Sequence, residues 1–250
     1  MNRIEQAFKK TKKALIVFIM AGDPSLSRTE QIVRDIEKAG ADIIEIGIPF
    51  SDSIADGPTI QNAATRALKN NVSASDTIKL VKKIRKTSKI PIIFMTSFNI
   101  LFSYGLEKFV NEASAAGVDG LILPDLPLEE ADSIKKNGLD LIFLIAPNSS
   151  DERIKLAAQK SSGFIYAVSF TGITGAKKDL HLTVQGVIAK LRKLTKTPIA
   201  IGFGISNPKQ ASEASRLADG IIVGSAVIDV ISKKPKQVGK FVASLKKAIL

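Results

Sequence analysis

The sequence contains no cysteine and a single histidine, His181. The lack of cysteine excludes a disulfide framework, a cysteine-ligated zinc site, an iron–sulfur cluster and a thiol nucleophile. With one histidine, this chain alone supplies no multi-histidine metal site, and a Ser-His-Asp triad would depend on His181. We therefore expect a chemistry that needs neither a thiol nor a metal, and no metal site in this chain.

Long hydrophobic runs are also missing. The longest unbroken apolar segment, 14–21, has eight residues, far fewer than the roughly 20 that a membrane-spanning helix needs. The first residues, Met-Asn-Arg-Ile-Glu, contain no apolar core of signal-peptide length. We expect a cytoplasmic protein without membrane contact. Its 250 residues are enough to bury a large core without cross-links.

Acidic residues are outnumbered by basic ones. The chain has 36 Lys and Arg against 24 Asp and Glu, a formal net charge of +12. Such a balance is compatible with a nucleic-acid partner or a membrane surface. However, the basic residues are scattered over most predicted helices, and no basic stretch is interleaved with aromatic residues. We expect a solvated, lysine-rich surface and no nucleic-acid partner.

Short apolar runs alternate with segments of helical periodicity along the whole chain. Strands separated by helices in this way form parallel sheets, and eight such units in 250 residues fit a (β/α)8 barrel. The eight predicted strands are 15–20, 42–46, 92–95, 120–123, 141–145, 164–168, 199–201 and 220–223.

The sequence thus predicts one α/β domain over residues 1–250, a (β/α)8 TIM barrel with an extra N-terminal helix around Ile4 and Phe8. A final helix containing Phe241, Leu245 and Ile249 would complete it. A doubly wound open sheet is the structural alternative. In a barrel the active site lies where the strands run into the following loops, which restricts the search for function to eight short stretches.

The second predicted strand places a carboxyl group inside this barrel. Side chains alternate along a strand, so Ile44, Ile46 and Ile48 share one face and Glu45 lies on the other. We expect the isoleucines to meet the helices and Glu45 to point inward near the mouth. Burial there raises the pKa of a carboxyl group, which suits it to give and take protons. A structural ion pair is the alternative, but the eight strand runs contain no Lys or Arg.

The segment that follows, 47–58, is long for a connection between strand and helix, and long loops are often functional. It carries Asp52 and Asp56. Asp56 leads into an apparent helix, so it is either the N-cap of that helix or a functional acid at the mouth, or both.

Glycine-rich loops follow the last two strands, at 202–206 and 224–226. Glycines let backbone N–H groups approach an anion, and a helix N-terminus adds partial positive charge. Phosphate sites in barrels are often built from these two loops, so we expect a phosphate-binding site here. The long loop 169–178 either closes as a lid or is a plain surface loop.

Other absences narrow the chemistry. No lysine stands at a strand end, which argues against a Schiff-base aldolase. With one histidine and no cysteine, a metal-dependent aldolase is also disfavoured. We expect His181 on a solvated helix. The remaining possibility is carboxylate acid–base catalysis on a phosphorylated small molecule.

Residues 45–61, Glu-Ile-Gly-Ile-Pro-Phe-Ser-Asp-Ser-Ile-Ala-Asp-Gly-Pro-Thr-Ile-Gln, resemble the signature of the tryptophan synthase alpha subunit family. The resemblance covers nearly the whole chain, including 21–24, 124–127, 171–175 and 202–206. It implies a (β/α)8 barrel that cleaves indole-3-glycerol phosphate to indole and glyceraldehyde 3-phosphate by a retro-aldol reaction, in the last steps of tryptophan biosynthesis. It also implies that this chain itself needs no cofactor.

The resemblance further implies roles for individual residues. Glu45 is the general acid/base, which protonates the indole ring carbon and removes the proton of the side-chain hydroxyl. Asp56 hydrogen-bonds the indole N–H and stabilises the indolenine, and Tyr166 assists near Glu45. The other implied substrate contacts are Gly175, Gly204, Gly224 and Ser225 at the phosphate, Phe18, Met95 and Phe203 around the indole, and Thr174 in the lid.

Family members work with a pyridoxal-phosphate beta subunit, in an assembly of two alpha and two beta chains with an indole tunnel between them. The resemblance implies the same partner here, contacted by the loops after the second and third strands. Ser53 stands where the family usually has proline, and Ser-Phe-Asn-Ile at 97–100 replaces a frequent Tyr-Tyr-Asn-Pro. These departures concern binding of the beta subunit and signalling to it, whereas Glu45 and Asp56 are intact.

Two other functions remain open from the sequence. A sugar-phosphate isomerase or epimerase would explain the glycine-rich loops but not the whole of 45–61. The second function is that of a non-catalytic subunit, which binds ligand and only activates a beta partner. Intact Glu45 and Asp56 argue against it.

Overall fold

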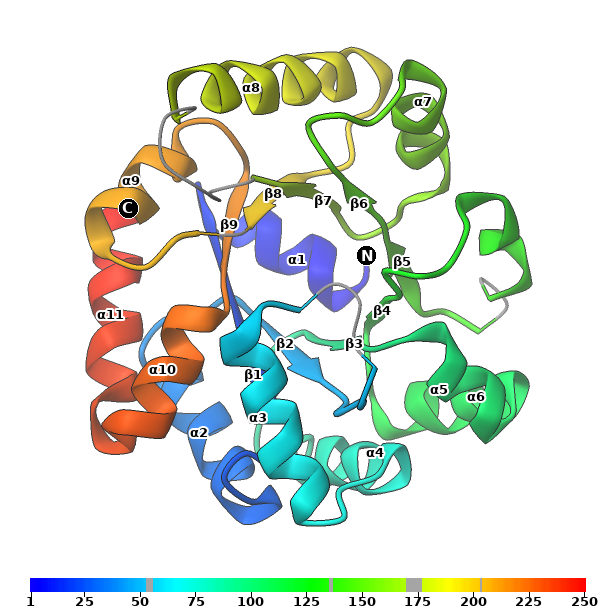
Figure 1. The fold of residues 1–250 in the computed structure, drawn as a ribbon, viewed down its shortest axis with the longest axis vertical. Coiled ribbons are helices and arrows are strands. Elements are labelled where there is room, and N and C mark those ends of the chain that lie inside the picture. The colour runs from blue at the N-terminus through cyan, green and yellow to red at the C-terminus, as the bar shows by residue number, and fades with distance from the viewer. Residues whose placement is uncertain (53–55, 135–136, 170–176, 203) are drawn as a thin grey trace.

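The computed structural model describes residues 1–52, 56–134, 137–169, 177–202 and 204–250. Within these ranges all the strands are parallel and belong to one sheet, in the order β5-β4-β3-β2-β1-β9-β8-β7-β6 (Figure 1). The strands are β1 (Ala14–Met20), β2 (Ile43–Gly47), β3 (Ile92–Met95), β4 (Gly120–Ile122), β5 (Asp140–Ile142), β6 (Leu144–Ile145), β7 (Ile165–Val168), β8 (Ile199–Gly202) and β9 (Gly220–Val223).

The two ends of this sheet are nearly joined by the chain itself. β5 and β6 stand at opposite ends of the strand order, yet only Phe143 separates them in sequence. The Phe143 carbonyl also accepts a hydrogen bond of 3.1 Å from the N–H of Tyr166 in β7. The predicted strand 141–145 is therefore divided into two short strands, one for each neighbour, and the predicted (β/α)8 barrel is confirmed.

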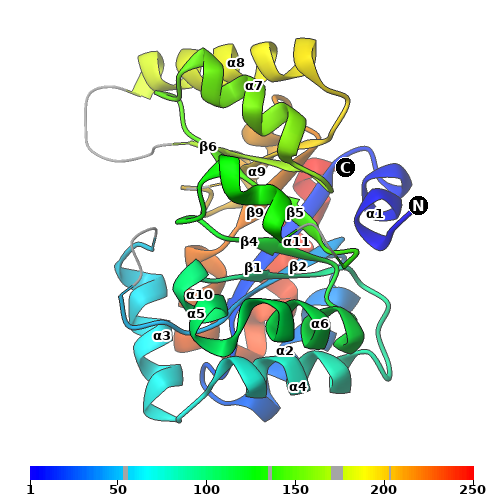
Figure 2. The same ribbon diagram turned by 90° about the vertical axis from the view of Figure 1, so that its right-hand side faces the viewer.

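Helices surround the barrel on all sides (Figures 1 and 2). They are α1 (Arg3–Lys10), α2 (Leu26–Lys38), α3 (Pro58–Lys69), α4 (Ala74–Ile84), α5 (Phe98–Tyr104), α6 (Leu106–Ala116), α7 (Asp151–Lys160), α8 (Lys177–Leu194), α9 (Pro208–Ser215), α10 (Ser225–Lys233) and α11 (Val238–Ile249), with 3-10 turns η1 (Leu128–Ser133) and η2 (Pro235–Gln237). No described helix combines the length and the apolar character needed to cross a membrane.

The hydrophobic core has two layers, as the alternation along β2 predicts. Ile44 and Ile46 pack with the helices in the outer layer, whereas Ile43 belongs to the cluster inside the barrel. The extra helix α1 closes one end of that interior with Ile4, which is fully buried, and Phe8, whose ring lies 5.7 Å from that of Phe164. In Figure 2, α1 lies at the opposite end of the barrel from α3, so the mouth of the barrel is at the α3 end.

Aspartates that immediately precede a strand fasten the closed end. Asp42, Asp119 and Asp219 accept backbone N–H bonds of 2.7–2.9 Å from the start of the neighbouring strand. Each also pairs with a cation in or at the end of a helix: Lys246 in α11, Arg85 just after α4 and Arg192 in α8, respectively. Because these pairs link each strand to its neighbour and to a covering helix, they stabilise the barrel away from its mouth.

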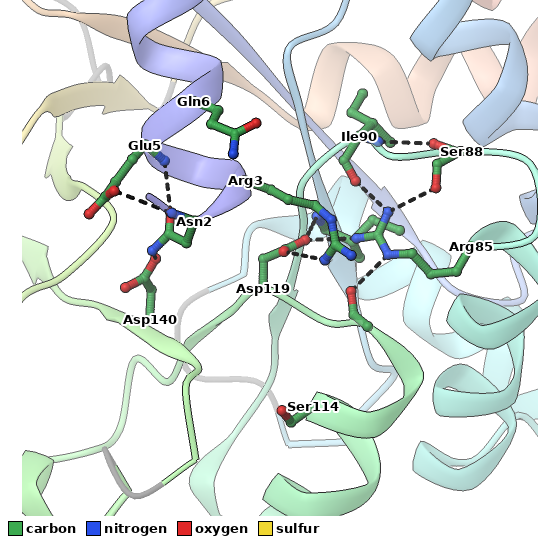
Figure 3. Close-up of polar contacts among 12 residues, drawn as sticks. Asn2, Arg3, Glu5, Gln6, Arg85, Ser88, Ile90, Ser114, Asp119 and Asp140 are labelled. Carbon is green, nitrogen blue, oxygen red and sulfur yellow. Dashed lines mark hydrogen bonds and ion pairs between the residues drawn. The ribbon is translucent and has the colours of Figure 1, made fainter.

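Asp119 has the richest set of partners and supports a stability prediction (Figure 3). Its carboxylate accepts from Arg3 at 2.8 Å, from Arg85 at 2.7 Å and from the Ile92 N–H at 2.8 Å. Asp119→Ala leaves Arg85 largely buried without its counter-charge, which should lower the free energy of unfolding by about 3–5 kcal/mol. Urea unfolding measures the loss.

A matched control for this prediction is the solvent-exposed pair of Lys190 with Asp151. Asp151→Ala should lower the free energy of unfolding far less, because exposed ion pairs contribute little to stability. Equal losses of unfolding free energy in the two variants would show that the network around Asp119 stabilises the protein no more than an exposed ion pair does.

Candidate active site

Glu45 lies in the middle of β2, beside Phe18 of β1 and Ile93 of β3 in the strand register. Its side chain is 1% exposed, and its Oε2 has no hydrogen-bond partner among the described residues. Burial, and secondarily the charge of Asp56, raise the pKa of Glu45 to about 8. A buried acceptor without a partner is rare in folded proteins and points to a ligand or a reaction. The burial of Glu45 inside the barrel agrees with the predicted inward direction, and its pKa is raised for the predicted reason, burial.

Asp56 enters the site from the loop that precedes α3. The N-cap of α3 is Gly57, with Pro58 at the first helical position, so the N-cap interpretation of Asp56 is wrong. Asp56 lines the cavity at the barrel mouth, and Gln61 Nε2 holds its backbone carbonyl at 2.9 Å. Since the charge of Asp56 acts on the pKa of Glu45, the two carboxyl groups lie within electrostatic reach of each other.

Tyr166 lies inside the barrel on β7 and is 5% exposed. Burial raises the pKa of its hydroxyl well above the usual range, and the charges of Glu45 and Asp56 add to the effect. The ring occupies the space in front of Gly202, where a Cβ would lie 2.3 Å from the Tyr166 hydroxyl oxygen. The glycine at the end of β8 therefore makes room for the tyrosine beside the two acids.

A cavity at the barrel mouth opens to solvent, and the space in it that a water molecule can enter is small, about 30 Å³. The predicted residues Phe18, Met95 and Asp56 are in its wall. The wall residues that sequence reasoning did not single out are Met20, Gly47, Ile48, Phe50, Thr96, Ser97, Pro124 and Asp125. All of them stand at a strand end or in the loop after it, so their position in the predicted barrel was the available signal.

The predicted phosphate positions lie in the loops after β8 and β9. Gly204 has φ +75°, a conformation that side chains rarely adopt. Gly224 is the N-cap of α10, whose first residue is Ser225, and as a glycine it offers no capping side chain. A Cβ on Gly224 would lie 3.4 Å from the Phe18 Cβ, so the start of α10 adjoins the aromatic wall of the cavity. Gly204, Gly224 and Ser225 are not themselves in that wall.

Several sequence-predicted positions lie outside the described residues: Ser53 in the loop after β2, Thr174 and Gly175 in the predicted lid, and Phe203 in the predicted indole pocket. His181 is in α8, as predicted for a helical residue. Across the described part of the chain, no group of three or more His, Asp or Glu side chains is arranged to hold a metal ion.

Comparison with known proteins gives one consistent family. The family model described as "Tryptophan synthase alpha chain" matches residues 4–249. The chain is 46% identical to the tryptophan synthase alpha chain of Thermoanaerobacter sp. (strain X514) over 263 aligned positions, which cover 100% of both proteins.

Solved structures agree with this result. Tryptophan synthase subunit alpha from Legionella pneumophila superposes with a TM-score of 0.90 at 36% identity, covering 100% of this chain and 98% of the other. A chain from the tryptophan synthase a2b2 complex of Pyrococcus furiosus superposes with a TM-score of 0.84 at 35% identity, covering 94% and 97%.

Proposed function

The chain belongs to the tryptophan synthase alpha chain family, and we propose that Glu45 and Asp56 are the acids that carry out its reaction. That reaction is the retro-aldol cleavage of indole-3-glycerol phosphate to indole and glyceraldehyde 3-phosphate. The observation that carries the assignment is the buried Glu45 carboxyl, with pKa about 8 and an unpartnered Oε2, within reach of the charge of Asp56.

The proton transfers of this reaction need one group that acts first as an acid and then as a base. Neutral Glu45 gives its proton to the indole ring carbon that bears the side chain, which leaves positive charge on the ring nitrogen. The Asp56 carboxylate accepts the N–H hydrogen bond and stabilises that charge. Ionised Glu45 then removes the proton of the adjacent side-chain hydroxyl. The carbon–carbon bond breaks, its electrons return to the indole ring, and Glu45 ends protonated as it began.

A carboxyl group with a pKa near 8 suits both of these steps. At neutral pH it is mostly protonated, so it is ready to donate, and its anion in a desolvated site is a stronger base than an ordinary carboxylate. Tyr166, which is electrostatically coupled to both acids, is proposed to assist Glu45 during these transfers.

The rest of the substrate extends over the aromatic wall and the glycine loops. Phe18 and Met95 in the cavity wall favour the indole ring as their neighbour. Gly204, Gly224 and Ser225 are proposed to bind the phosphate, because the uncapped start of α10 offers backbone N–H groups to an anion. Phe203, Thr174 and Gly175 belong to the same proposal by their place in the sequence.

The protein partner is a tryptophan synthase beta subunit, as the a2b2 complex of the Pyrococcus furiosus relative indicates. We propose that pyridoxal phosphate is bound only by that partner and that the alpha chain works without a cofactor. A single barrel domain over residues 1–250 and a cytoplasmic location are parts of the same proposal. The continuous sheet supports the first, and the family's role in amino-acid biosynthesis supports the second.

The direct test is to mix the purified full chain with indole-3-glycerol phosphate and follow indole release, alone and with its beta subunit. We expect indole in both mixtures and faster release in the complex. No release in either mixture would contradict the proposed roles of Glu45 and Asp56.

The pH dependence of kcat/KM follows from the raised pKa of Glu45. The free enzyme must hold Glu45 protonated to start the reaction, so the rate should fall as pH rises through about 8. An unburied glutamate would ionise near 4.5 and place this fall well below neutrality. Initial rates between pH 6 and 9.5, in buffers of constant ionic strength, measure the alkaline limb.

A further inference from the structure

A partly buried ion pair joins the end of β1 to the flank of α3: the Asp23 side chain is buried, and that of Arg66 is partly exposed. Asp23 follows β1 and is 3% exposed. Arg66 of α3 donates from Nε to Asp23 Oδ1 and from a terminal nitrogen to Oδ2, both at 2.8 Å. A bidentate guanidinium fixes the orientation as well as the distance of its partner. The pair therefore sets how α3 lies against the β1 strand.

Two further contacts strengthen this junction. Asn70, just after α3, donates its side-chain amide to the backbone carbonyls of Pro24 at 2.8 Å and Gly22 at 3.3 Å. Gly22 has φ +82°, and a Cβ there would lie 2.4 Å from Val72 Cγ2, so the chain after β1 approaches the end of α3 as closely as glycine permits. The C-terminal half of α3 is thus held on the β1 loop.

The junction connects two walls of the candidate active site. β1 supplies Phe18 and Met20 to the cavity, and α3 begins two residues after Asp56. Gln61 in the first turns of α3 holds the Asp56 carbonyl, which ties Asp56 to the helix. The N-cap of α3 is Gly57, which has no side chain to cap the helix. α3 is one continuous helix that rises about 1.5 Å per residue. A change in its orientation at Arg66 therefore also moves its first turns and, through Gln61, Asp56.

We propose that Arg66 is a positioning residue for the cleavage reaction. Through its pair with Asp23, it holds α3 so that Asp56 stays beside the aromatic wall and within reach of Glu45. Arg66 is not in the cavity wall and acts only through Asp56. The inference rests on the proposed function, since it presupposes the role of Asp56 in catalysis.

The test compares Arg66→Gln, Arg66→Lys and Asp56→Asn with the wild-type full chain in complex with its beta subunit. Arg66→Gln should lower kcat about 10- to 100-fold, since small misplacements of catalytic groups have effects of this size. Arg66→Lys keeps the charge but loses the two-nitrogen fork, so its kcat should be intermediate.

The alkaline limb of kcat/KM separates positioning from simple loss of stability. Asp56 and Tyr166 are the groups coupled to Glu45 in the described structure, and the charge of Asp56 raises the pKa of Glu45. Moving Asp56 away should shift the limb of Arg66→Gln to lower pH, in the direction of Asp56→Asn. Losing the positive charge of Arg66 would by itself shift the limb to higher pH, so the sign of the shift identifies the cause.

Arg85→Gln is the matched control. It removes a guanidinium from buried Asp119 at the closed end of the barrel. It should lower the free energy of unfolding while leaving kcat per folded molecule and the pH profile unchanged. A shifted profile in Arg85→Gln would mean that the readout reports stability, and the inference would fall.

The outcomes also separate this inference from the proposed function. Wild-type activity in Asp56→Asn overturns the proposed function and the inference with it. If Asp56→Asn is inactive but Arg66→Gln keeps the wild-type kcat and pH profile, only the positioning role is overturned. If Arg66→Gln does not fold, Arg66→Lys decides: a lowered kcat and a limb shifted to lower pH support the inference, and wild-type behaviour overturns it.

Discussion

Glu45→Gln should lower kcat by about 10²–10⁴-fold, the contribution that a positioned acid–base group makes to a rate. The amide has nearly the shape of the carboxyl group, but it cannot give a proton to the indole ring carbon or take one from the side-chain hydroxyl. Both proton transfers are therefore lost together. Stopped assays of indole release in the complex with the beta subunit measure the effect.

Binding and stability should change little in the same variant. Glu45 is 1% exposed and mostly protonated at neutral pH, so a neutral amide suits its surroundings. Calorimetric titration with a substrate analogue that lacks the side-chain hydroxyls should give a dissociation constant close to that of the wild type. If Glu45→Gln kept wild-type turnover, Glu45 would not be the acid–base group.

Asp56→Asn should lower kcat by about 10²–10³-fold, the size of effect seen when a group that stabilises transition-state charge is removed. The amide still accepts a hydrogen bond from the indole N–H, but it no longer offers a negative charge to the developing indolenine. Hence kcat should fall more than KM rises, because the lost interaction is stronger in the transition state than in the bound substrate.

A second signature of Asp56→Asn lies in the pH profile. The charge of Asp56 raises the pKa of Glu45, so its removal should lower that pKa and move the alkaline limb of kcat/KM below its wild-type position. Asp52→Asn is the control, since Asp52 is an exposed acid in the same loop and is not among the causes of the Glu45 shift. A limb that stays in place in Asp56→Asn would contradict the coupling between the two acids.

Much of the barrel could be predicted from the sequence, because its signals are local. Alternation along β2 alone placed Glu45 on the inner face and Ile44 and Ile46 on the outer face. The break at Phe143 was not predictable, since Leu-Ile-Phe-Leu-Ile at 141–145 is an unbroken apolar run. In the structure the first part of this run pairs with β4 and the last part with β7, and Phe143 lies between them.

The N-cap alternative for Asp56 could have been excluded from the sequence. Proline is favoured at the first helical position, and the residue before a proline is pushed to extended conformations. Pro58 therefore makes Gly57 the N-cap of α3, with φ −76° and ψ 169°, and places Asp56 one residue outside the helix. Asp56 therefore precedes the helix and lines the cavity at the barrel mouth.

The cavity wall and the α3 junction depend on contacts between distant segments, which a single sequence does not reveal. Ser97 and Asp125 are 28 residues apart, and their side chains meet at 2.5 Å in the cavity wall. Asp23 and Arg66 are 43 residues apart. In both pairs, the local sequence around one residue does not indicate its partner, because only the folded barrel brings the two together.

Glu45 should be a neutral acid at physiological pH, because burial raises its pKa. The most direct measurement is a ¹³C NMR titration of the protein labelled at its glutamate carboxyl carbons, with Glu45→Gln to assign the resonance. We expect a midpoint near pH 8 for Glu45, against about 4.5 for an unperturbed glutamate. A Glu45 resonance that titrates near 4.5 would contradict it.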